Sequence, residues 1–519
     1  MELEKINEIE EATWVNRKEV FRLGVAVMFI VGIMLYVGSR GDVSNMLIIA
    51  GIIGGYMAIN IGANDVANNV GPAVGSRALT LAGAIAIAAI FEASGALIAG
   101  GDVVSTIKKG IIDPANINDT DVFIWLMMAA LLAAALWLNL ATAIGAPVST
   151  THSIVGGVLG AGVAAGGWDV VNWAKMGQIA ASWVISPVLG GIIAAAFLYY
   201  IKRTITYKKD MLFAARRMVP ILVAIMAFTF ATYLALKGFK KIWKIDFSMA
   251  LMIGAGVAIV IYGISRPWVE RRAKRNSNDK QGINQLFTIP LIFAAALLSF
   301  AHGANDVANS VGPLAAINDA LTTGDISSKA SIPLWVMMIG AIGITLGLAL
   351  YGPKLIKTVG SEITELDKMR AFCVALSAAI TVIVATQLGL PVSSTHIAVG
   401  AVFGVGFLRE YLKASYAKMI EQIHLHHLGR DEAVVEKFLE DFRYANLEEK
   451  SNMLQQLKEH STDADLSKRE RRSLKRVYRH ELVKRSALLK IAAAWVITVP
   501  VSAALAALLF FMIRGMMLP

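Results

Sequence analysis

Cysteine is nearly absent from this 519-residue chain, which contains a single one, Cys373. One cysteine forms no intramolecular disulfide, so a disulfide-stabilised secreted scaffold is excluded. Charge is also scarce: Asp, Glu, Lys and Arg make up 17% of the residues, against about a quarter in soluble domains. Hydrophobic residues make up 56%, which excludes a disordered protein and an ordinary soluble enzyme. The composition therefore indicates a polytopic membrane protein with some soluble mass.

Acidic residues are fewer than basic ones, 38 against 49, and the formal net charge is +11. A basic excess can indicate nucleic-acid binding, but no basic and aromatic surface pattern supports it here. Basic loops at the cytoplasmic face explain the excess better, under the positive-inside rule. We therefore expect a lipid bilayer as the surroundings and no nucleic acid as a partner. Segment 1–14 lacks the basic stretch and cleavage site of a secretory signal, so we expect the next apolar run to be a retained helix.

Long apolar runs dominate the chain. A membrane-spanning helix needs about 20 apolar residues. The candidate spans lie near 21–38, 46–61, 80–100, 122–144, 178–201, 218–236, 247–265, 285–301, 332–352, 371–390 and 487–513. Two further glycine-rich apolar stretches, 154–167 and 397–408, follow prolines and are expected to span or re-enter the membrane. The sequence thus predicts about 11 to 13 crossings.

Two polar segments interrupt these runs. Residues 266–283 form a basic loop, and residues 409–486 mix both signs of charge with apolar residues at helical spacing. The second pattern predicts a small cytoplasmic helical insertion. We divide the chain into an N-terminal segment with the first membrane helix (1–45), transport repeat 1 (46–205), linking membrane helices with the basic loop (206–284), the first part of transport repeat 2 (285–408), the insertion (409–486) and the final membrane helix of repeat 2 (487–519).

An internal repeat is the most informative feature. The sequence GANDVAN occurs at 62–68 and again at 303–309, and PVSTTH at 147–152 returns as PVSSTH at 391–396. A third pair, SWVISP at 182–187 and AWVITVP at 494–500, follows in the same order. The fold class we predict is an all-α polytopic membrane protein built from two related repeats with broken or re-entrant helices. An inverted relation between the repeats is our expectation.

The GANDVAN segment places a carboxylate, Asp65 or Asp306, at the end of an apolar helix. A charge in hydrocarbon costs at least about 2.5 kcal/mol, so acids at membrane depth are functional by default. The following Gly71 and Pro72 favour a break in the helix, and broken helices are tolerated where they line a cavity or an ion site. Carboxylate, amide and carbonyl oxygens are hard ligands that suit Na⁺ or another hard cation.

The second motif offers anion ligands. Its proline favours a helix start, where free backbone N–H groups and the helix dipole attract anions. Hydroxyl donors follow in both copies, at Ser149–Thr151 and at Ser393–Thr395. Two such helix starts could converge on one tetrahedral oxyanion. Two halves with interrupted polar segments are the sequence pattern of a secondary transporter with alternating access.

The acids also bear on which anion is carried. Asp65 and Asp306 would repel a fully deprotonated oxyanion, but phosphate keeps a proton that a carboxylate can accept in a hydrogen bond. The pattern favours phosphate with a co-bound cation. A proton-coupled phosphate permease, or a permease for sulfate or another oxyanion, stays as the alternative. An enzyme is not expected, because neither half contains a clustered nucleophile or metal set.

These duplicated motifs resemble those of the inorganic phosphate transporter (PiT) family, and the resemblance covers about 45–205 and 285–515. The stretch 62–113 is most similar to the sodium-dependent symporter branch. The resemblance implies a multi-pass phosphate importer of the cytoplasmic membrane that co-transports Na⁺ (or H⁺), with no cofactor, no metal beyond Na⁺ and a homodimeric assembly. The implied phosphate ligands are Asp65, Asn68, Ser149, Thr150, Thr151, Asp306, Asn309, Ser393, Ser394 and Thr395. The implied sodium ligands are Asn64, Asp65, Thr142, Asn305, Asp306 and Thr386.

Some residues do not follow the duplication. Glu92 has no counterpart, because Ala375 stands where sodium-coupled members carry a second-half glutamate. His302 precedes only the second GANDVAN, and we interpret it as a buried histidine with satisfied hydrogen bonds. Glu92, His152 and His396 are candidates for coupling or gating. A structural role is the alternative for all three, and for the two histidines, which could orient the hydroxyl loops, it is the favoured one.

Overall fold

The structure is a computed structural model. It describes residues 2–41, 44–113, 116–117, 119–146, 148–238, 245–324, 326, 332–362, 366–427 and 485–517. Within those ranges the chain is helical, apart from turns, loops and an isolated bridge between Ile112 and Val171. Eleven of the described helical segments are long and apolar enough to cross a membrane. This confirms the predicted all-α polytopic membrane fold. Most of the predicted insertion (428–484) and Pro147 lie outside the described residues.

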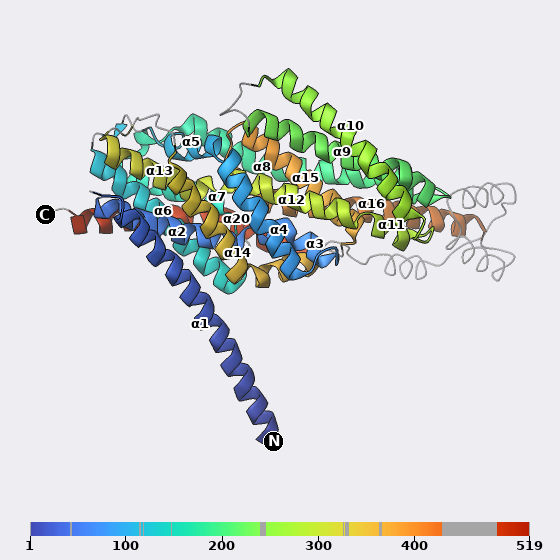
Figure 1. The fold of residues 1–519 in the computed structure, drawn as a ribbon, viewed down its shortest axis with the longest axis horizontal. Helices are drawn as coiled ribbons and strands as arrows, with labels where there is room; N and C mark the ends of the chain where they lie inside the picture. Colours follow the sequence, from blue (N-terminus) through green and yellow to red (C-terminus); the bar gives the residue numbers. More distant parts are fainter. Residues whose placement is uncertain are drawn as a thin grey trace.

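The first half follows an N-terminal helix whose outer part projects from the bundle (Figure 1). Its elements are α1 (Glu2–Gly38), α2 (Asn45–Asn64), α3 (Ala67–Gly75), α4 (Leu81–Ala99), α5 (Gly101–Lys109), α6 (Thr120–Ile144), α7 (Thr150–Gly166), the 3₁₀ turn η2 (Trp168–Val170), α8 (Trp173–Ile201) and the π turn η3 (Lys202–Thr206).

Three helices link the halves, and the second half then repeats the first. The linking helices are α9 (Met211–Lys237), α10 (Phe247–Ala273) and α11 (Lys280–Leu286). The second half comprises α12 (Thr288–Asp306), α13 (Ala308–Thr323), α14 (Leu334–Glu362), α15 (Lys368–Gln387), α16 (Ser394–His427) and α20 (Arg485–Met517). By the positions of the shared motifs, α2–α3 corresponds to α12–α13, α6–α7 to α15–α16, and α8 to α20.

In each half, the helix that carries the GANDVAN motif is broken. The break separates α2 from α3 at Asp65–Val66, and α12 from α13 at Val307. Both breaks lie earlier than the Gly-Pro pairs that suggested them, because Pro72 and Pro313 are inside α3 and α13. The carboxylates therefore lie at the interruptions: Asp65 is within the first, and Asp306 is the last residue of α12.

Each half also contains a helical hairpin whose turn is the second motif. Gly145 ends α6 with a positive φ of 75°, and Gly389 has the corresponding value of 65° after α15. Glycine adopts this left-handed conformation without a steric cost. Ser149 and Ser393 then cap the returning helices, each accepting a hydrogen bond from the backbone N–H three residues on.

The two halves exchange packing partners. Helix α2 packs on α14 and α12 packs on α4, while α7 packs on α20 and α16 on α8 (Figure 1). Small residues allow these crossings: a Cβ on Gly62 would lie 1.9 Å from the Ile344 carbonyl oxygen, and one on Gly303 would lie 2.1 Å from that of Glu92. Close glycine contacts are a common basis of helix packing in membranes. Each half thus holds the broken helix of the other.

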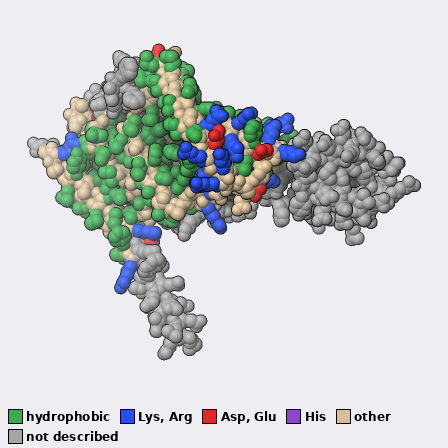
Figure 2. All heavy atoms as spheres, turned by 45° about the vertical axis from the view of Figure 1, so that its right-hand side comes forward, with side chains coloured by type: hydrophobic (Ala, Val, Ile, Leu, Met, Phe, Trp, Pro, Cys, Tyr) green, Lys and Arg blue, Asp and Glu red, His purple; other side chains and the backbone are tan. Residues whose placement is uncertain are grey.

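The molecular surface separates into an apolar flank and a basic end. Figure 2 shows hydrophobic side chains over the flank and Lys and Arg gathered at one end. Basic residues exposed near that end include Arg203, Lys208, Arg271, Arg272 and Arg275. The predicted basic loop at 266–283 is largely helical, since α10 continues to Ala273 and α11 begins at Lys280. Under the positive-inside rule this end would face the cytoplasm.

Candidate functional site

The first cluster surrounds Asp65, at the break after α2. Its carboxylate accepts hydrogen bonds from Thr150 at 2.6 Å and from Thr395. The two hydroxyls come from different halves, because Thr150 begins α7 and Thr395 lies in the first turn of α16. Asn68 adds a hydrogen bond from its Nδ2 to Thr395 Oγ1, at 2.7 Å. All four side chains are fully buried.

The second cluster surrounds Asp306 and mirrors the first in part. Ser394 donates to Asp306 Oδ2 at 3.1 Å. Asn309, the counterpart of Asn68, donates to Thr150 Oγ1 at 3.1 Å and to Thr151 Oγ1 at 3.2 Å. Each amide therefore reaches across to the hairpin of the other half. The two clusters share Thr150 and form one buried polar network.

Two of the ten predicted phosphate ligands have other contacts. Ser149 caps His152 N–H at 3.1 Å and lies 2.7 Å from His152 Nδ1, and Ser393 caps His396 N–H at 3.2 Å. They stabilise the starts of α7 and α16. The structure brings the other eight together within the Asp65–Asp306 network.

The predicted sodium ligands Asn64 and Asn305 each connect a broken helix to a hairpin through hydrogen bonds. Asn64 Nδ2 donates to Thr142 Oγ1 at 3.0 Å and to the Ala146 carbonyl at 3.1 Å. Asn305 Nδ2 donates to Thr386 Oγ1 at 2.9 Å and to the Leu390 carbonyl at 3.2 Å. The repeat therefore preserves this contact down to its atoms, and the structure places each of these asparagines beside the predicted threonine ligand of its own half.

The unmatched residues of the two halves pair with each other. Glu92 Oε2 lies 2.6 Å from His302 Nδ1, and His302 Nε2 lies 2.7 Å from Asp306 Oδ2. Asn69 donates to the other oxygen of Glu92 at 2.8 Å. His302 is fully buried, as predicted; its Nδ1 lies against Glu92, whereas its Nε2 has no hydrogen bond of regular geometry. Its partner was not predicted, although one signal was available: Glu92 and His302 both lack an ionisable counterpart in the other half.

Hard and borderline ligands converge between the two clusters. The carboxylates of Asp65 and Asp306 and a ring nitrogen of His302 offer ligand atoms within 4.8 Å of one another. Among the described residues, three buried acceptor oxygens nearby have no hydrogen-bond partner: Asn68 Oδ1, Asn309 Oδ1 and Asp306 Oδ1. Buried acceptors are normally satisfied. Their geometry suits a cation or a ligand that brings its own O–H group.

The candidate gating histidines lie in a stack of four rings. His152 stacks on Trp183 with ring centroids 3.7 Å apart, and His396 stacks on Trp495 at 3.6 Å. The two imidazoles are themselves 4.4 Å apart. The third pair of repeated motifs supplies both tryptophans. This explains the third pair structurally: it joins the two hairpins behind the polar network.

Comparison with known proteins identifies a family and several similar sequences. A model described as the phosphate transporter family matches residues 61–506. A Helicobacter pylori protein named "Putative phosphate permease" is 54% identical over 98% of each chain. A similarly named protein of Pyrococcus abyssi is 40% identical over 71% of this chain and 90% of its own length.

A solved structure also matches. It is titled "The sodium-dependent phosphate transporter", has a TM-score of 0.73 and 32% sequence identity, and covers 92% of this chain and 100% of its own. Four of our expectations stay predictions: the site residues, the domain boundaries, the absence of a cofactor and the homodimer. The chain belongs to the phosphate transporter family and is a multi-pass membrane transporter rather than an enzyme.

Proposed function

We propose that the chain imports inorganic phosphate by co-transport with Na⁺, and that the Asp65–Asp306 network is the transport site. Phosphate would be held by the hydroxyls and amides of Thr150, Thr151, Asn309, Ser394, Thr395 and Asn68. Sodium would be held by the two carboxylates and by the Asn64–Thr142 and Asn305–Thr386 pairs. Alternating access by two inversely related repeats belongs to the same proposal.

One observation carries it: hydroxyls that could bind phosphate donate instead to the two carboxylates. Asp65 occupies the Thr150 and Thr395 hydroxyls, and Asp306 occupies that of Ser394. A cation bound to these carboxylates would compensate their charge and release the hydroxyls toward an anion. Sodium and phosphate would thus favour each other's binding, which is what coupled transport requires.

Protonated phosphate fits the network better than sulfate does. A site with two carboxylates repels an anion unless a cation or a hydrogen bond offsets the charge. Phosphate at neutral pH retains an O–H group, which Asp306 Oδ1 or a free amide oxygen could accept. Sulfate has no proton to donate there.

Proton coupling is the second candidate, and the Glu92–His302–Asp306 chain favours it. An imidazole flanked by carboxylates on both nitrogens donates to both only when it is protonated. Histidine is the side chain best suited to gain and lose a proton near neutral pH. This chain would supply the proton carrier if sodium does not drive uptake.

Uptake of radiolabelled phosphate into proteoliposomes separates the candidates. We expect accumulation under an inward Na⁺ gradient at equal pH on both sides, inhibited by unlabelled arsenate and not by sulfate. Accumulation under a pH gradient alone would replace sodium by the proton. Uptake inhibited equally by sulfate would contradict the phosphate preference. Empty liposomes provide the control.

A further inference from the structure

A polar stripe leads to the sodium-ligand pair of the first half and is missing from the second. Tyr56 and Asn60 precede Asn64 at successive helical turns of α2, and Asn139 precedes Thr142 by one turn of α6. Counted from the shared motifs, their second-half counterparts are the apolar Leu297, Ala301 and Ile383. The stripe is thus not a consequence of the duplicated fold.

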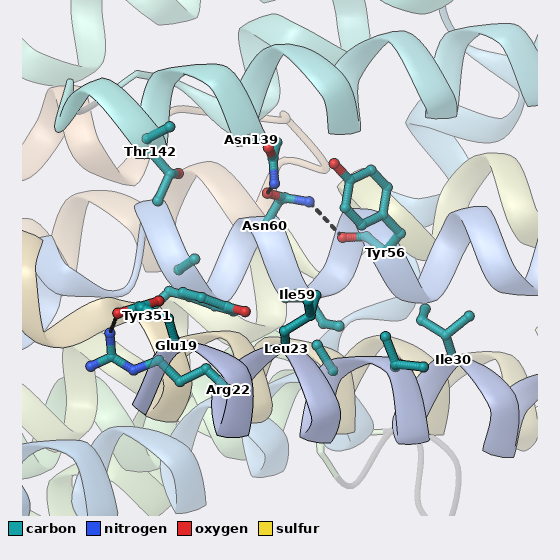
Figure 3. A pocket seen from close by; sticks show the side chains of 14 residues that line it. Glu19, Arg22, Leu23, Ile30, Tyr56, Ile59, Asn60, Asn139, Thr142 and Tyr351 are labelled. Atoms are coloured by element: carbon teal, nitrogen blue, oxygen red, sulfur yellow. Dashed lines mark hydrogen bonds and ion pairs between the residues drawn. The ribbon is translucent and has the colours of Figure 1, made fainter. Parts of the chain in front are cut away.

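The stripe forms one wall of a cavity of about 600 Å³ between α1, α2, α6 and α14. Figure 3 shows Asn60, Asn139 and Thr142 on one side and the side chains of α1 on the other. Thr142, which also accepts a hydrogen bond from Asn64, lines it directly. At about 30 Å³ per water molecule, the volume has room for roughly 20 waters. The cavity therefore reaches the sodium-ligand pair and is large enough for a hydrated ion.

Most of the lining is apolar, with Leu23, Ala26, Val27 and Ile30 supplied by α1, and its polar groups on α2 and α6 suit a hydrated cation better than an anion. Asn60 Oδ1 accepts from Asn139 Nδ2 at 3.3 Å, and Asn60 Nδ2 donates to the Tyr56 carbonyl at 2.9 Å (Figure 3). These neutral oxygens can exchange with water around a cation and do not bind it too tightly to leave. The cationic lining residue Arg22 is paired with Glu19 at 2.5 Å. No uncompensated positive charge of the lining would repel a cation or attract phosphate.

We propose that this cavity is a water-filled vestibule through which Na⁺ reaches Asn64 and Thr142 from one side of the membrane, with α1 as its outer wall. The inference rests on the proposed function, because it concerns the route to a proposed sodium site. Helix α1 lies outside the residues matched by the family model, which begin at 61.

Thiol labelling tests the vestibule without relying on transport. The natural Cys373 is fully buried, so the wild-type chain is the unlabelled control. Asn139→Cys and Ala143→Cys place a thiol on the lining. Val184→Cys, at a residue 69% exposed on the apolar flank of α8, and Ile383→Cys, at the buried counterpart of Asn139, are matched controls. A charged, membrane-impermeant thiosulfonate is supplied on both sides of proteoliposomes.

We expect both lining cysteines to react at least about tenfold faster than either control, and Na⁺ to slow Ala143→Cys relative to choline. Labelling no faster than at Val184→Cys would overturn the proposal, because the cavity would then hold lipid rather than water. Rapid labelling that Na⁺ does not slow would overturn the sodium route.

Phosphate uptake by variants of Glu19 and Arg22, the charged residues of the cavity lining, gives an independent test. Removing Arg22 frees Glu19, so Arg22→Gln should lower the Na⁺ concentration for half-maximal uptake about twofold at low ionic strength, and Glu19→Gln should raise it. At saturating Na⁺ the KM for phosphate should not change, because coupling acts only through Na⁺ occupancy. Equal shifts in both variants, or a shift in the phosphate KM, would contradict the proposal.

The vestibule and the proposed function fail in different ways. Wild-type uptake that no Na⁺ gradient drives would contradict the proposed function alone. Protection of Ala143→Cys by Na⁺ would then still support the vestibule, and its absence would overturn both.

Discussion

The two halves of the molecule share a frame and differ in the groups that fill it. Both break a helix at an aspartate, both turn a hairpin at a left-handed glycine, and both join the two with an asparagine–threonine pair. The first half adds Glu92 and a polar stripe, and the second adds His302. Duplication therefore preserved the backbone geometry, while the residues that differ are free to give each half its own task.

The aspartates make the difference concrete. Asp65 accepts from two hydroxyls and lies 4.0 Å from His302 Nε2, whereas Asp306 accepts from one hydroxyl and lies 2.7 Å from that nitrogen. Equivalent positions in the sequence thus have unequal electrostatic surroundings. The comparison teaches that the proposed site is a symmetric scaffold with an asymmetric charge distribution.

The largest expected effect comes from removing either carboxylate. Asp65→Asn and Asp306→Asn keep the side-chain shape but lose the charge that we propose balances Na⁺. We expect both to reduce sodium-driven phosphate uptake to the background of empty liposomes. Size-exclusion profiles in detergent should match the wild type and so exclude misfolding. Normal uptake by either variant would remove that aspartate from the proposed site.

The cross-half pair should show a large stability effect. Removing His302 leaves Glu92 and Asp306 buried without their partner, and breaking a buried ion pair costs about 3–5 kcal/mol. His302→Gln should therefore lower the Tm strongly, while the double variant Glu92→Gln with His302→Gln should recover part of the loss. A double-mutant cycle of Tm values in detergent measures the coupling. Additive effects would show that the two side chains do not interact.

Removing the asparagine–threonine contact should have the same effect on sodium dependence in both halves. Asn64→Ala and Asn305→Ala each remove hydrogen bonds to a threonine and a hairpin carbonyl, worth about 1 kcal/mol apiece. We expect the Na⁺ concentration for half-maximal uptake to rise about five- to tenfold in both variants. A change confined to one variant would place sodium in one half only. Asn276→Ala, in the linking segment, is a matched control.

The smallest effect should lie outside both halves, at the start of α11. Asp279 accepts the Gly282 N–H at 2.7 Å, and this backbone hydrogen bond holds the pKa of the carboxyl below its ordinary value of 3.8. A lowered folded-state pKa stabilises the fold above the ordinary value, and the contribution is lost as pH falls through the lowered one. Asp279→Ala should therefore lower the Tm slightly at pH 7, by an amount that shrinks below pH 4, with uptake unchanged. An equal Tm difference at both pH values would contradict the capping role.

Much of the site could be predicted from the sequence because its residues recur in two motifs with fixed order. The eleven spans followed from apolar length. Asn64, Thr142, Asn305 and Thr386 were named only through the family resemblance, and the sequence did not pair them. The position of the helix break was less predictable. Glycine and proline suggested it near Pro72, whereas the chain interrupts the helix at Asp65 and Val66 and Pro72 lies inside α3.

The sequence by itself determined the membrane class, the repeats and the residue types that meet at the site, because hydrophobic length and motif identity are local properties. Only the tertiary structure decided which side chains face one another. Residues such as Glu92 and His302, or Asn68 and Thr395, lie hundreds of positions apart. Their pairing depends on how glycine contacts let the helices of one half cross those of the other. This packing depends on the complementary surfaces of two helices, so the sequence of either helix alone does not specify it.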